Sequence, residues 1–438
     1  MTFDDARTLY RERSALLRAD AAEADRARAA AEAAKSLSGP KVELAGGYVK
    51  GHKDIKVDVP SRVQQVGNGA ASMLHLPVSV PSSLTYSNYD LSGPRALLQA
   101  SWVLYAGGRI SAQQNVLEDK ARMAEADQAG RFEAKDAELA QRYWGVQLAR
   151  SVAELRRSRL ADEEAQVVRA KRFEKKGLIS GLERLSVEVS RDAARREARA
   201  AETSAHVAEA ELMHELRETT LPVLSTPLFV LSGDLGTLSA WQKKARMNSP
   251  LLRKTDAQIA AAAEGVRAAK GSFHPQVFAF GMKNLVKHYL TPVEPDWMAG
   301  IGVKITLWDT QDRLSGLAAA RAQERQAQAA RDETDNQLMS AVETAFLRTT
   351  EARDEYDLTA STVNLAAENL RLREKSFGEG LSTAIDVREA RTQLTGAQIA
   401  QRAAAYKFVA AWAMLHASCG AMTEFSESLA RSDFVAVK

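Results

Sequence analysis

The segment that decides the fold spans residues 132–167 and reads FEAKDAELAQRYWGVQLARSVAELRRSRLADEEAQV. An apolar residue recurs in it at every seventh position: Phe132, Leu139, Val146, Ala153, Leu160 and Val167. A seven-residue repeat sustained over this length predicts a helix in a left-handed coiled coil. The surrounding residues 109–176 contain no proline, and at about 1.5 Å per residue one helix over them would be about 100 Å long.

A second proline-free stretch, residues 313–377, carries two apolar series instead of one. Tyr356, Val363, Leu370 and Phe377 form the first series, and Leu358, Leu365 and Leu372 form the second. At about 100° per residue, an offset of two places the series about 200° apart around the helix. A helix with apolar seams on opposite sides has a neighbour on each side, so the pattern favours a closed ring of helices over a two-stranded coil.

The chain contains two copies of one plan. Residues 16–40 match residues 251–275 at an offset of 235, and residues 177–183 match residues 380–386 at an offset of 203. The difference, 235 − 203 = 32, indicates an insertion between Pro40 and Gly177 of the first copy, which we expect within residues 51–94.

Each copy reads as helix, strand, loop, strand, long helix, tight turn and helix, so the sequence predicts a mainly α protein with a small β part. The expected boundaries are a first repeat at 1–220 (strand pair 40–105, long helix 109–176, helix 182–220), a linker at 221–238, a second repeat at 239–425 (strand pair 275–308, long helix 313–377, helix 383–420) and a tail at 426–438. Four strands cannot form a core of their own, so other copies of the chain are expected to complete the sheet.

Composition excludes several classes of protein. Lys plus Arg is 59 and Asp plus Glu is 56, which gives a net charge of only +3 and argues against a nucleic-acid partner. Cys419 is the single cysteine, so an internal disulfide is impossible. No stretch of about 18 apolar residues encodes a transmembrane helix. The first residues lack the basic-then-apolar pattern of a signal peptide, so we expect either a cytoplasmic protein or a mature form.

The sequence offers no catalytic or cofactor-binding pattern. His206 and His214 share a helix but have no third candidate ligand, so no metal site is expected. Residues 106–109 (AGGR) lack the downstream Lys-Ser/Thr of a phosphate-binding loop. Nucleophile-elbow and HExxH patterns are also missing. We therefore expect no enzyme activity and no cofactor.

Four local patterns, duplicated and in a fixed order, resemble the TolC-like outer membrane efflux proteins over residues 3–419. They are a helix-to-strand entry at 272–277 (SFHPQV), a strand-to-helix exit at 102–109 (WVLYAGGR), and two helix-turn-helix tips at 173–185 and 377–390. The second exit, 307–313 (LWDTQDR), departs from the family pattern because it lacks the Gly pair.

The resemblance implies a homotrimer in which three chains form a twelve-stranded barrel in the bacterial outer membrane and a periplasmic tube of helices. It also implies a passive exit duct for efflux or type I secretion, joined through a periplasmic adaptor to an inner membrane pump or ABC transporter. On this reading the missing signal peptide has been removed. The alternative is a soluble coiled-coil scaffold, which has no need for the duplicated strand pair.

Two turns are candidate contact sites. In each, Gly allows the left-handed conformation at a helix end, and Ser or Thr then caps the next helix. The resemblance implies that these tips meet adaptor hairpins, so the candidate contact residues are Gly177, Leu178, Ile179, Gly380, Leu381 and Ser382. The alternative is ordinary helix-hairpin chemistry.

Acidic residues beside the tips are candidates for a channel gate. Asp386 and Glu389 lie three apart on one helix face, and Glu183 corresponds to Asp386 in the first copy. The resemblance makes them an acidic ring at the periplasmic entrance, where like charges would raise pKa values and attract cations. The alternative is a solvated acidic helix face.

Aromatic residues near the predicted strands suit the interface of a membrane barrel, or simple strand packing. They are Tyr86, Tyr89, Trp102, Tyr105, Tyr289, Trp297 and Trp308.

Overall fold

The computed structural model describes residues 1–438 except 91, 288–293, 308–311, 380 and 438, and for 52–57 and 84–90 it describes the backbone alone. Tyr289, Trp308 and Gly380 therefore lie outside the described residues. The chain divides into two compact units, one made of residues 1–29, 119–260 and 325–438, the other of residues 30–118 and 261–324. They are called here the helical unit and the sheet unit, and each is described by itself.

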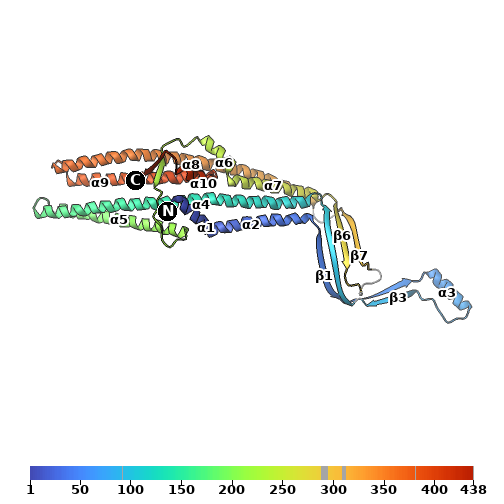
Figure 1. The fold of residues 1–438 in the computed structure, drawn as a ribbon. Coiled ribbons are helices and arrows are strands. Elements are labelled where there is room, and N and C mark those ends of the chain that lie inside the picture. The colour runs from blue at the N-terminus through green and yellow to red at the C-terminus, as the bar shows by residue number, and fades with distance from the viewer. Residues whose placement is uncertain (91, 288–293, 308–311, 380, 438) are drawn as a thin grey trace. The chain divides into compact units, whose positions relative to one another are not determined.

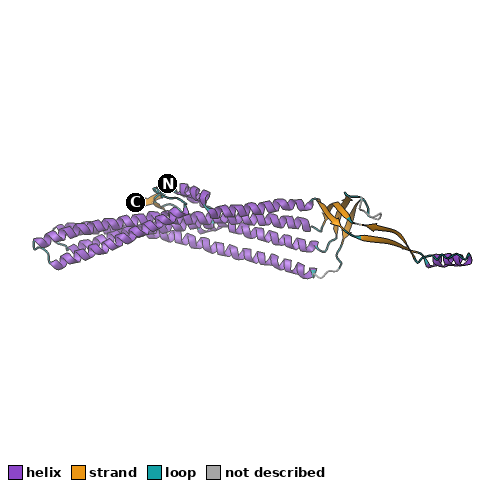
Figure 2. Ribbon diagram, turned by 90° about the horizontal axis from the view of Figure 1, so that it is seen from below, coloured by secondary structure: helices purple, strands orange, loops and turns teal. Residues whose placement is uncertain are grey.

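Figures 1 and 2 show the helices and strands of the chain. The helices are α1 (Phe3–Arg13), α2 (Ala15–Lys35), α3 (Ser61–Met73), α4 (Arg109–Lys175), α5 (Gly181–Glu215), α6 (Leu238–Asn248), α7 (Pro250–Gly271), α8 (Arg313–Gly378), α9 (Ala384–Ser418) and α10 (Met422–Ser428), with a 3₁₀ turn at Ser36–Ser38. The strands are β1 (Lys41–Val49), β2 (His52–Asp58), β3 (Ser83–Asp90), β4 (Gly93–Tyr105), β5 (Leu228–Leu231), β6 (Gln276–Asn284), β7 (Trp297–Lys304) and β8 (Phe434–Val437).

The helical unit is built on two helical hairpins, α4 with α5 and α8 with α9 (Figure 1). Arg150 of α4 pairs with Glu209 of α5 at 2.6 Å, and Lys407 of α9 pairs with Glu355 of α8 at 2.8 Å. Both long helices lack proline and are rich in Ala, Arg, Glu and Leu, which are the strongest helix formers. No helix of the described residues is long and apolar enough to cross a membrane.

The seven-residue series of α4 lies on its packed side. Leu139, Val146, Ala153 and Val167 are buried, and Phe132 and Leu160 are half-buried. In α8 the two series differ. Tyr356, Val363, Leu370 and Phe377 are half-buried, whereas Leu358, Leu365 and Leu372 are 71%, 71% and 48% exposed. A single chain therefore covers only one of the two seams of α8.

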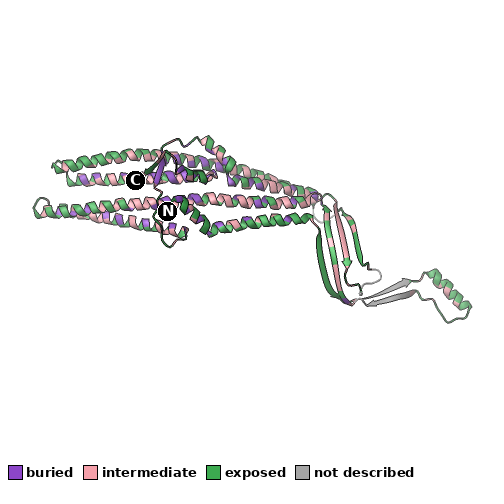
Figure 3. Cartoon of the chain, in the orientation of Figure 1, coloured by how far each residue is buried: buried purple, intermediate pink, exposed green. Residues whose placement is uncertain are grey.

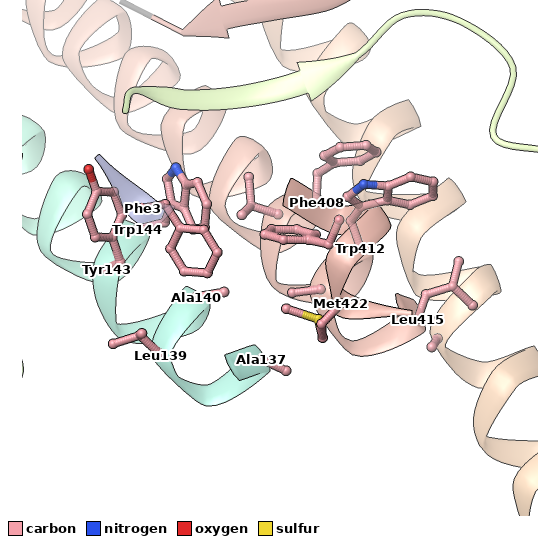
Figure 4. Close-up of a cluster of buried hydrophobic side chains, with 14 of the residues drawn as sticks. Phe3, Ala137, Leu139, Ala140, Tyr143, Trp144, Phe408, Trp412, Leu415 and Met422 are labelled. Atoms are coloured by element: carbon pink, nitrogen blue, oxygen red, sulfur yellow. The ribbon is translucent and has the colours of Figure 1, made fainter. Parts of the chain in front are cut away.

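An aromatic core holds the hairpins of the helical unit to the chain ends (Figure 4). Phe3 of α1 lies against Trp144 of α4, with ring centroids 4.7 Å apart, and Trp144 packs edge-on against Phe229 of β5. The indole N–H of Trp144 donates to the carbonyl of Pro227 at 2.9 Å. Residues 228–231, expected as part of a linker, form the fully buried strand β5, which pairs with β8 of the expected tail.

The sheet unit contains a four-stranded antiparallel sheet in the order β1-β4-β6-β7. Its central pair, β4 with β6, joins the two repeats, and β1 and β7 form its edges. Gly107 after β4 and Gly271 before β6 lie so close that a Cβ on either would be 2.5 Å from the other's carbonyl oxygen. Gly107 also has a φ of +64°, which favours glycine.

The first strand pair is longer than the second. Residues 51–94, where the sequence predicted an insertion, contain β2, α3 and β3, and β2 pairs with β3 from His52↔Asp90 to Asp58↔Ser83. Ile55 and Val57 alternate with polar residues in β2, as a strand requires, and Pro60 stops that strand and precedes α3. We call residues 51–92 the hairpin insert.

Candidate functional site

The turn between α4 and α5 is a compact helix stop. Gly177 has a φ of +70°, and the N–H of Leu178 donates to the carbonyl of Phe173 at 2.9 Å, the six-to-one bond of a Schellman motif. Ser180 then begins α5 as a reciprocal cap: its hydroxyl accepts from the N–H of Glu183 at 3.2 Å, and its own N–H donates to the Glu183 carboxylate at 2.7 Å.

The turn between α8 and α9 repeats this chemistry at the predicted offset of 203. The N–H of Leu381 donates to the carbonyl of Ser376 at 2.8 Å, which matches the bond from Leu178 to Phe173. Thr383 and Asp386 form the second reciprocal cap, with the Thr383 N–H at 2.8 Å from the Asp386 carboxylate. The duplication therefore extends to individual hydrogen bonds.

Both tips expose apolar side chains that contact no core. Leu178 is 65% exposed and Leu381 is 79% exposed, while Ile179 and Ser382 are half-buried. Further exposed residues at the tips were missing from the sequence-based candidates: Leu182, Leu185, Val189 and Ile385. The spacing of Leu182, Leu185 and Val189 (i, i+3, i+7) was the available signal, since it marks one face of a helix. Each tip is a small apolar surface.

Asp386 and Glu183 have a local role that the sequence did not assign to them. Three donors converge on the Asp386 carboxylate, namely the Thr383 N–H, the Thr383 hydroxyl and the Ser382 hydroxyl. These hydrogen bonds lower the pKa of Asp386 in the protomer. Glu183 is held in the same way by Ser180. Within one chain these carboxylates are helix caps.

Glu389 differs from both, because it is exposed and makes no hydrogen bond or ion pair within the part of the chain that the structure describes. The opposite face of α9 is anchored to the first hairpin. Arg388 donates to the Ser190 hydroxyl of α5 at 2.8 Å, and Arg391 lies 3.8 Å from Asp162 of α4. At about 100° per residue these arginines lie on the far side of α9 from Asp386 and Glu389. The acidic pair therefore points away from the α4–α5 hairpin.

A buried carboxylate lies at this contact between the hairpins. Glu163 of α4 is only 5% exposed, and burial raises its pKa, an effect that Arg159, Arg388 and Arg391 oppose. Two arginines of α9 thus face a buried acid of α4. Their positive charge favours the ionised form of Glu163 across the contact between the two hairpins.

In the sheet unit, one face of the four-stranded sheet is apolar and exposed. The register places on it Val42, Leu44, Tyr48, Leu98, Trp102, Trp297, Ile301 and Val303. All are more than a third exposed, from 38% for Leu98 to 73% for Tyr48 (Figure 3). Lys283 is the one charged residue that the register adds to this face, at the end of β6 where the hairpin closes. An apolar surface of this extent marks a contact with lipid or protein.

The opposite sheet face carries polar groups. Gln99 donates to the Glu43 carboxylate at 3.2 Å, and Arg95 pairs with Glu294 at 2.9 Å. Phe278 and Phe280 also lie on this face, where their rings cover Gly302 and Gly300 of β7. Leu97, Val103, Met282 and Met298 share this face as well, so it mixes polar and apolar residues, whereas the first face is apolar apart from Lys283.

Aromatic residues bracket the apolar face. Trp102 lies at one end of β4, where its indole N–H donates to the Ser38 carbonyl at 2.7 Å. Tyr48 pairs with Pro94 at the other end, so the two aromatic positions span nine residues of β4. A membrane-spanning β-strand has about 9–11 residues. Tyr48 was absent from the sequence-based candidates, although it alternates correctly with Val42 and Leu44.

The other aromatic candidates are placed in part. Trp297 is 68% exposed on the same face and Tyr105 is 46% exposed at the end of β4. Tyr86 and Tyr89 lie in β3, beyond the four-stranded sheet. Within the described residues, no group of three His, Cys, Asp or Glu side chains could hold a metal ion.

Comparison with known proteins gives one family and one fold. A family model described as Outer membrane efflux protein matches residues 241–421. No curated protein matches the chain in sequence.

Several solved structures share the fold of nearly the whole chain. VceC, an outer membrane protein of Vibrio cholerae, is 15% identical with a TM-score of 0.76 over 96% of each chain. The open state of the MtrE outer membrane channel of Neisseria gonorrhoeae is 16% identical with a TM-score of 0.74, over 96% of this chain and 89% of that one. CusC, whose structures concern transmembrane channel formation, is 13% identical with a TM-score of 0.77, over 96% and 92%.

These findings confirm the predicted resemblance and the predicted fold class, a mainly helical chain with coiled-coil and sheet parts. The structures, all below 20% identity, establish the fold, and the family model adds a match in sequence over residues 241–421. The match to a family of outer membrane efflux proteins agrees with the prediction that the chain is not an enzyme.

Proposed function

Because a model of the outer membrane efflux protein family matches residues 241–421 and the chain shares the fold of outer membrane channels, we propose that it is the protomer of a trimeric exit duct. The duct passes solutes out of the cell through the outer membrane in an efflux or type I secretion system. Its transport is passive, and its partners supply the energy. The duplicated plan, with repeats at 1–220 and 239–425 around a linker at 221–238 and before a tail at 426–438, supplies two hairpins and two strand pairs per chain.

The observation that carries the proposal is the exposed apolar sheet face between Trp102 and Tyr48. A soluble protein would lose solubility by exposing it, whereas acyl chains would cover it in a membrane. The polar face with Glu43 and Gln99 would then line the duct. The runner-up, a soluble coiled-coil scaffold, leaves this face without a purpose.

Two surfaces that a single chain leaves without a partner support the trimer. The edges of β1 and β7 have no strand partner within the four-stranded sheet, and edges in lipid must pair, so three chains close a barrel of twelve strands. The seam of Leu358, Leu365 and Leu372 on α8 is exposed, and a neighbouring protomer would cover it. Both features call for further copies of the same chain.

The two helical tips would contact the partner protein and line the entrance of the duct. Their exposed leucines, Leu178 and Leu381, with Gly177, Ile179, Gly380 and Ser382 around them, would contact a periplasmic adaptor protein. That adaptor would connect the duct to an inner membrane pump or ABC transporter. Asp386, Glu389 and Glu183 would line the periplasmic entrance. Glu389 is the strongest candidate for a free charge there, because Asp386 and Glu183 are engaged as caps.

The test is extraction followed by bilayer recording. We expect the protein to need detergent, to elute as a trimer, and to form ion-conducting channels in planar lipid bilayers. A monomer or dimer that stays soluble without detergent would refute the duct and favour the scaffold. A double substitution, Leu178→Asp with Leu381→Asp, should abolish co-purification with the adaptor while the trimer and its conductance remain.

A further inference from the structure

The hairpin insert distinguishes the two strand pairs of this chain. Between β6 and β7 the chain needs residues 285–296 only, whereas between β1 and β4 it has residues 50–92. The ribbon of β2 and β3 continues beyond the four-stranded sheet for seven residue pairs, about 23 Å, with neither β6 nor β7 beside it. A two-stranded ribbon alone is only marginally stable in water, so the insert needs a partner.

Polar contacts fix which side of α3 faces its own chain. Gln64 donates to the Val59 carbonyl at 2.6 Å, and Asn68 accepts from the N–H of Val80 at 2.6 Å. Gly67 lies so close to Val80 that an added Cβ would be 2.5 Å from its side chain. The polar side of α3 is therefore packed on residues 80–82.

The other side of α3 is an apolar stripe that the chain leaves uncovered. At about 100° per residue, Val63, Val66, Ala70, Met73 and Leu74 lie within a sector of about 100°. Val66 is 73% exposed, Met73 86% and Leu74 70%. Leu76 and Val78 extend the surface into the following segment. Figure 3 shows the helix exposed along its length.

Charge indicates what covers this stripe. Residues 59–89 contain no Asp or Glu, and Arg62 is their only Lys or Arg. Recognition of anionic lipid headgroups uses clusters of cations, which residues 59–89 lack. Identical copies of a nearly uncharged segment do not repel one another, so the stripe suits a second copy of itself.

We propose that α3 packs its apolar stripe against the α3 helices of the other two protomers, so that the three inserts close together beyond the membrane sheet. This inference rests on the proposed trimer, which by its symmetry would bring three inserts to the same end. It adds a contact between protomers that neither the sheet edges nor the α8 seam provides. Such a closure would narrow the exit of the duct.

Thiol crosslinking of the detergent-solubilised trimer tests the contact. Val66→Cys places a thiol on the stripe, and Ser72→Cys places a matched thiol on the opposite side of the same helix. Cys419 is fully buried, so the native protein gives little background. With a short bismaleimide, we expect Val66→Cys to yield covalent dimers at least about fivefold more than Ser72→Cys, and Met73→Cys to behave like Val66→Cys.

The outcomes separate this inference from the proposed function. If no trimer forms, the proposed function fails. If the trimer forms but Val66→Cys is not crosslinked, or Ser72→Cys is crosslinked equally, the contact between α3 helices is refuted. A fluorophore on Val66→Cys that is quenched by brominated phospholipids in reconstituted vesicles would instead assign the stripe to lipid and would also overturn the proposal.

Discussion

Thr383 and Asp386 cap the first turn of α9 reciprocally, each donating its backbone N–H to the side chain of the other, at 2.8 Å and 3.2 Å. Ser180 and Glu183 do the same for α5. The acidic residue three positions into each hairpin helix is therefore required by the turn itself, whatever its role in a channel. Of the three acidic gate candidates, only Glu389 takes no part in a helix cap.

The cap makes a local prediction. Thr383→Ala removes the acceptor for the Asp386 N–H and should cost about 1 kcal/mol at the start of α9. Amide exchange over residues 384–388, measured by mass spectrometry, should become about fivefold faster, while the α4–α5 tip is unchanged. Ser180→Ala is the matched control: it should make amide exchange faster at the start of α5 and leave the α8–α9 tip unchanged. Equal effects of either variant on both tips would contradict two independent caps.

Glu389 predicts an ionic selectivity. In the proposed trimer Glu389→Gln should lower the ratio of cation to anion permeability roughly twofold in low salt, because it removes three uncompensated charges near the entrance. Reversal potentials in planar bilayers measure this. Glu183→Gln, which alters a carboxylate engaged in a cap, should change the ratio less. Selectivity unaltered by Glu389→Gln would remove the acidic ring from the proposal.

Sequence patterns predicted the features that depend on neighbours along the chain. The heptad of α4, the tip turns and the offset between repeats all act through local spacing, and the structure contains the corresponding helices and hydrogen bonds. The apolar seam of Leu358, Leu365 and Leu372 was also visible, because a period of seven marks one helix side whether or not anything covers it.

Features that depend on partners distant in sequence could not be predicted. The capping role of Asp386 was missed for a different reason: Asp386 lies three residues after Thr383, which is the spacing of a capping box, but it was assigned to a gate instead. Residues 59–81 are rich in Pro, Ser, Asn and Gly, a composition that favours a loop. The helix within them is supported by hydrogen bonds from Gln64 to Val59 and from Val80 to Asn68, which the sequence alone does not show. The strand β5 forms because β8, about 200 residues later, pairs with it.

The exposed seam of α8 predicts how the trimer can be broken. Leu365→Asp should leave the protomer folded, since the side chain is 71% exposed, but should lower the trimer fraction at least tenfold because it buries unpaired charges between chains. Size-exclusion chromatography with light scattering measures the fraction. Asn364→Asp adds the same charge beside the seam and should preserve the trimer. An intact Leu365→Asp trimer would place the seam outside the protomer contact.

The two sheet faces predict opposite responses to one substitution. Leu98→Lys puts a charge on the apolar face and should cost about 2–4 kcal/mol in a bilayer, whereas Gln99→Lys puts it on the polar face and should be nearly neutral. Denaturant midpoints of the protein refolded into lipid vesicles measure both. If Gln99→Lys were the more destabilising variant, the faces would have been assigned the wrong way round.

Acid sensitivity of the helical core is the last prediction. His416 is buried between Trp241, Trp412 and Phe425, and its Nδ1 lies 2.9 Å from the Trp412 carbonyl. Burial lowers its pKa from 6.5 to about 4. Below pH 6.5 the imidazole of His416 is therefore protonated in the unfolded chain but stays neutral in the folded chain. The free energy of unfolding consequently falls as the pH drops from 7 toward 4, and it is about 2 kcal/mol lower at pH 5 than at pH 7.

His416→Phe should remove this loss, so that the change in unfolding free energy between pH 7 and pH 5 is about 2 kcal/mol smaller than in the native protein. The comparison is made between variants because Glu133, Asp136 and Glu163 also have pKa values raised by burial and contribute their own pH dependence. His206→Gln is the control, since that side chain is 80% exposed, and it should show the same loss of unfolding free energy between pH 7 and pH 5 as the native protein. Equal slopes for His416→Phe and the native protein would show that His416 is protonated in the folded state, and the buried neutral imidazole would have to be abandoned.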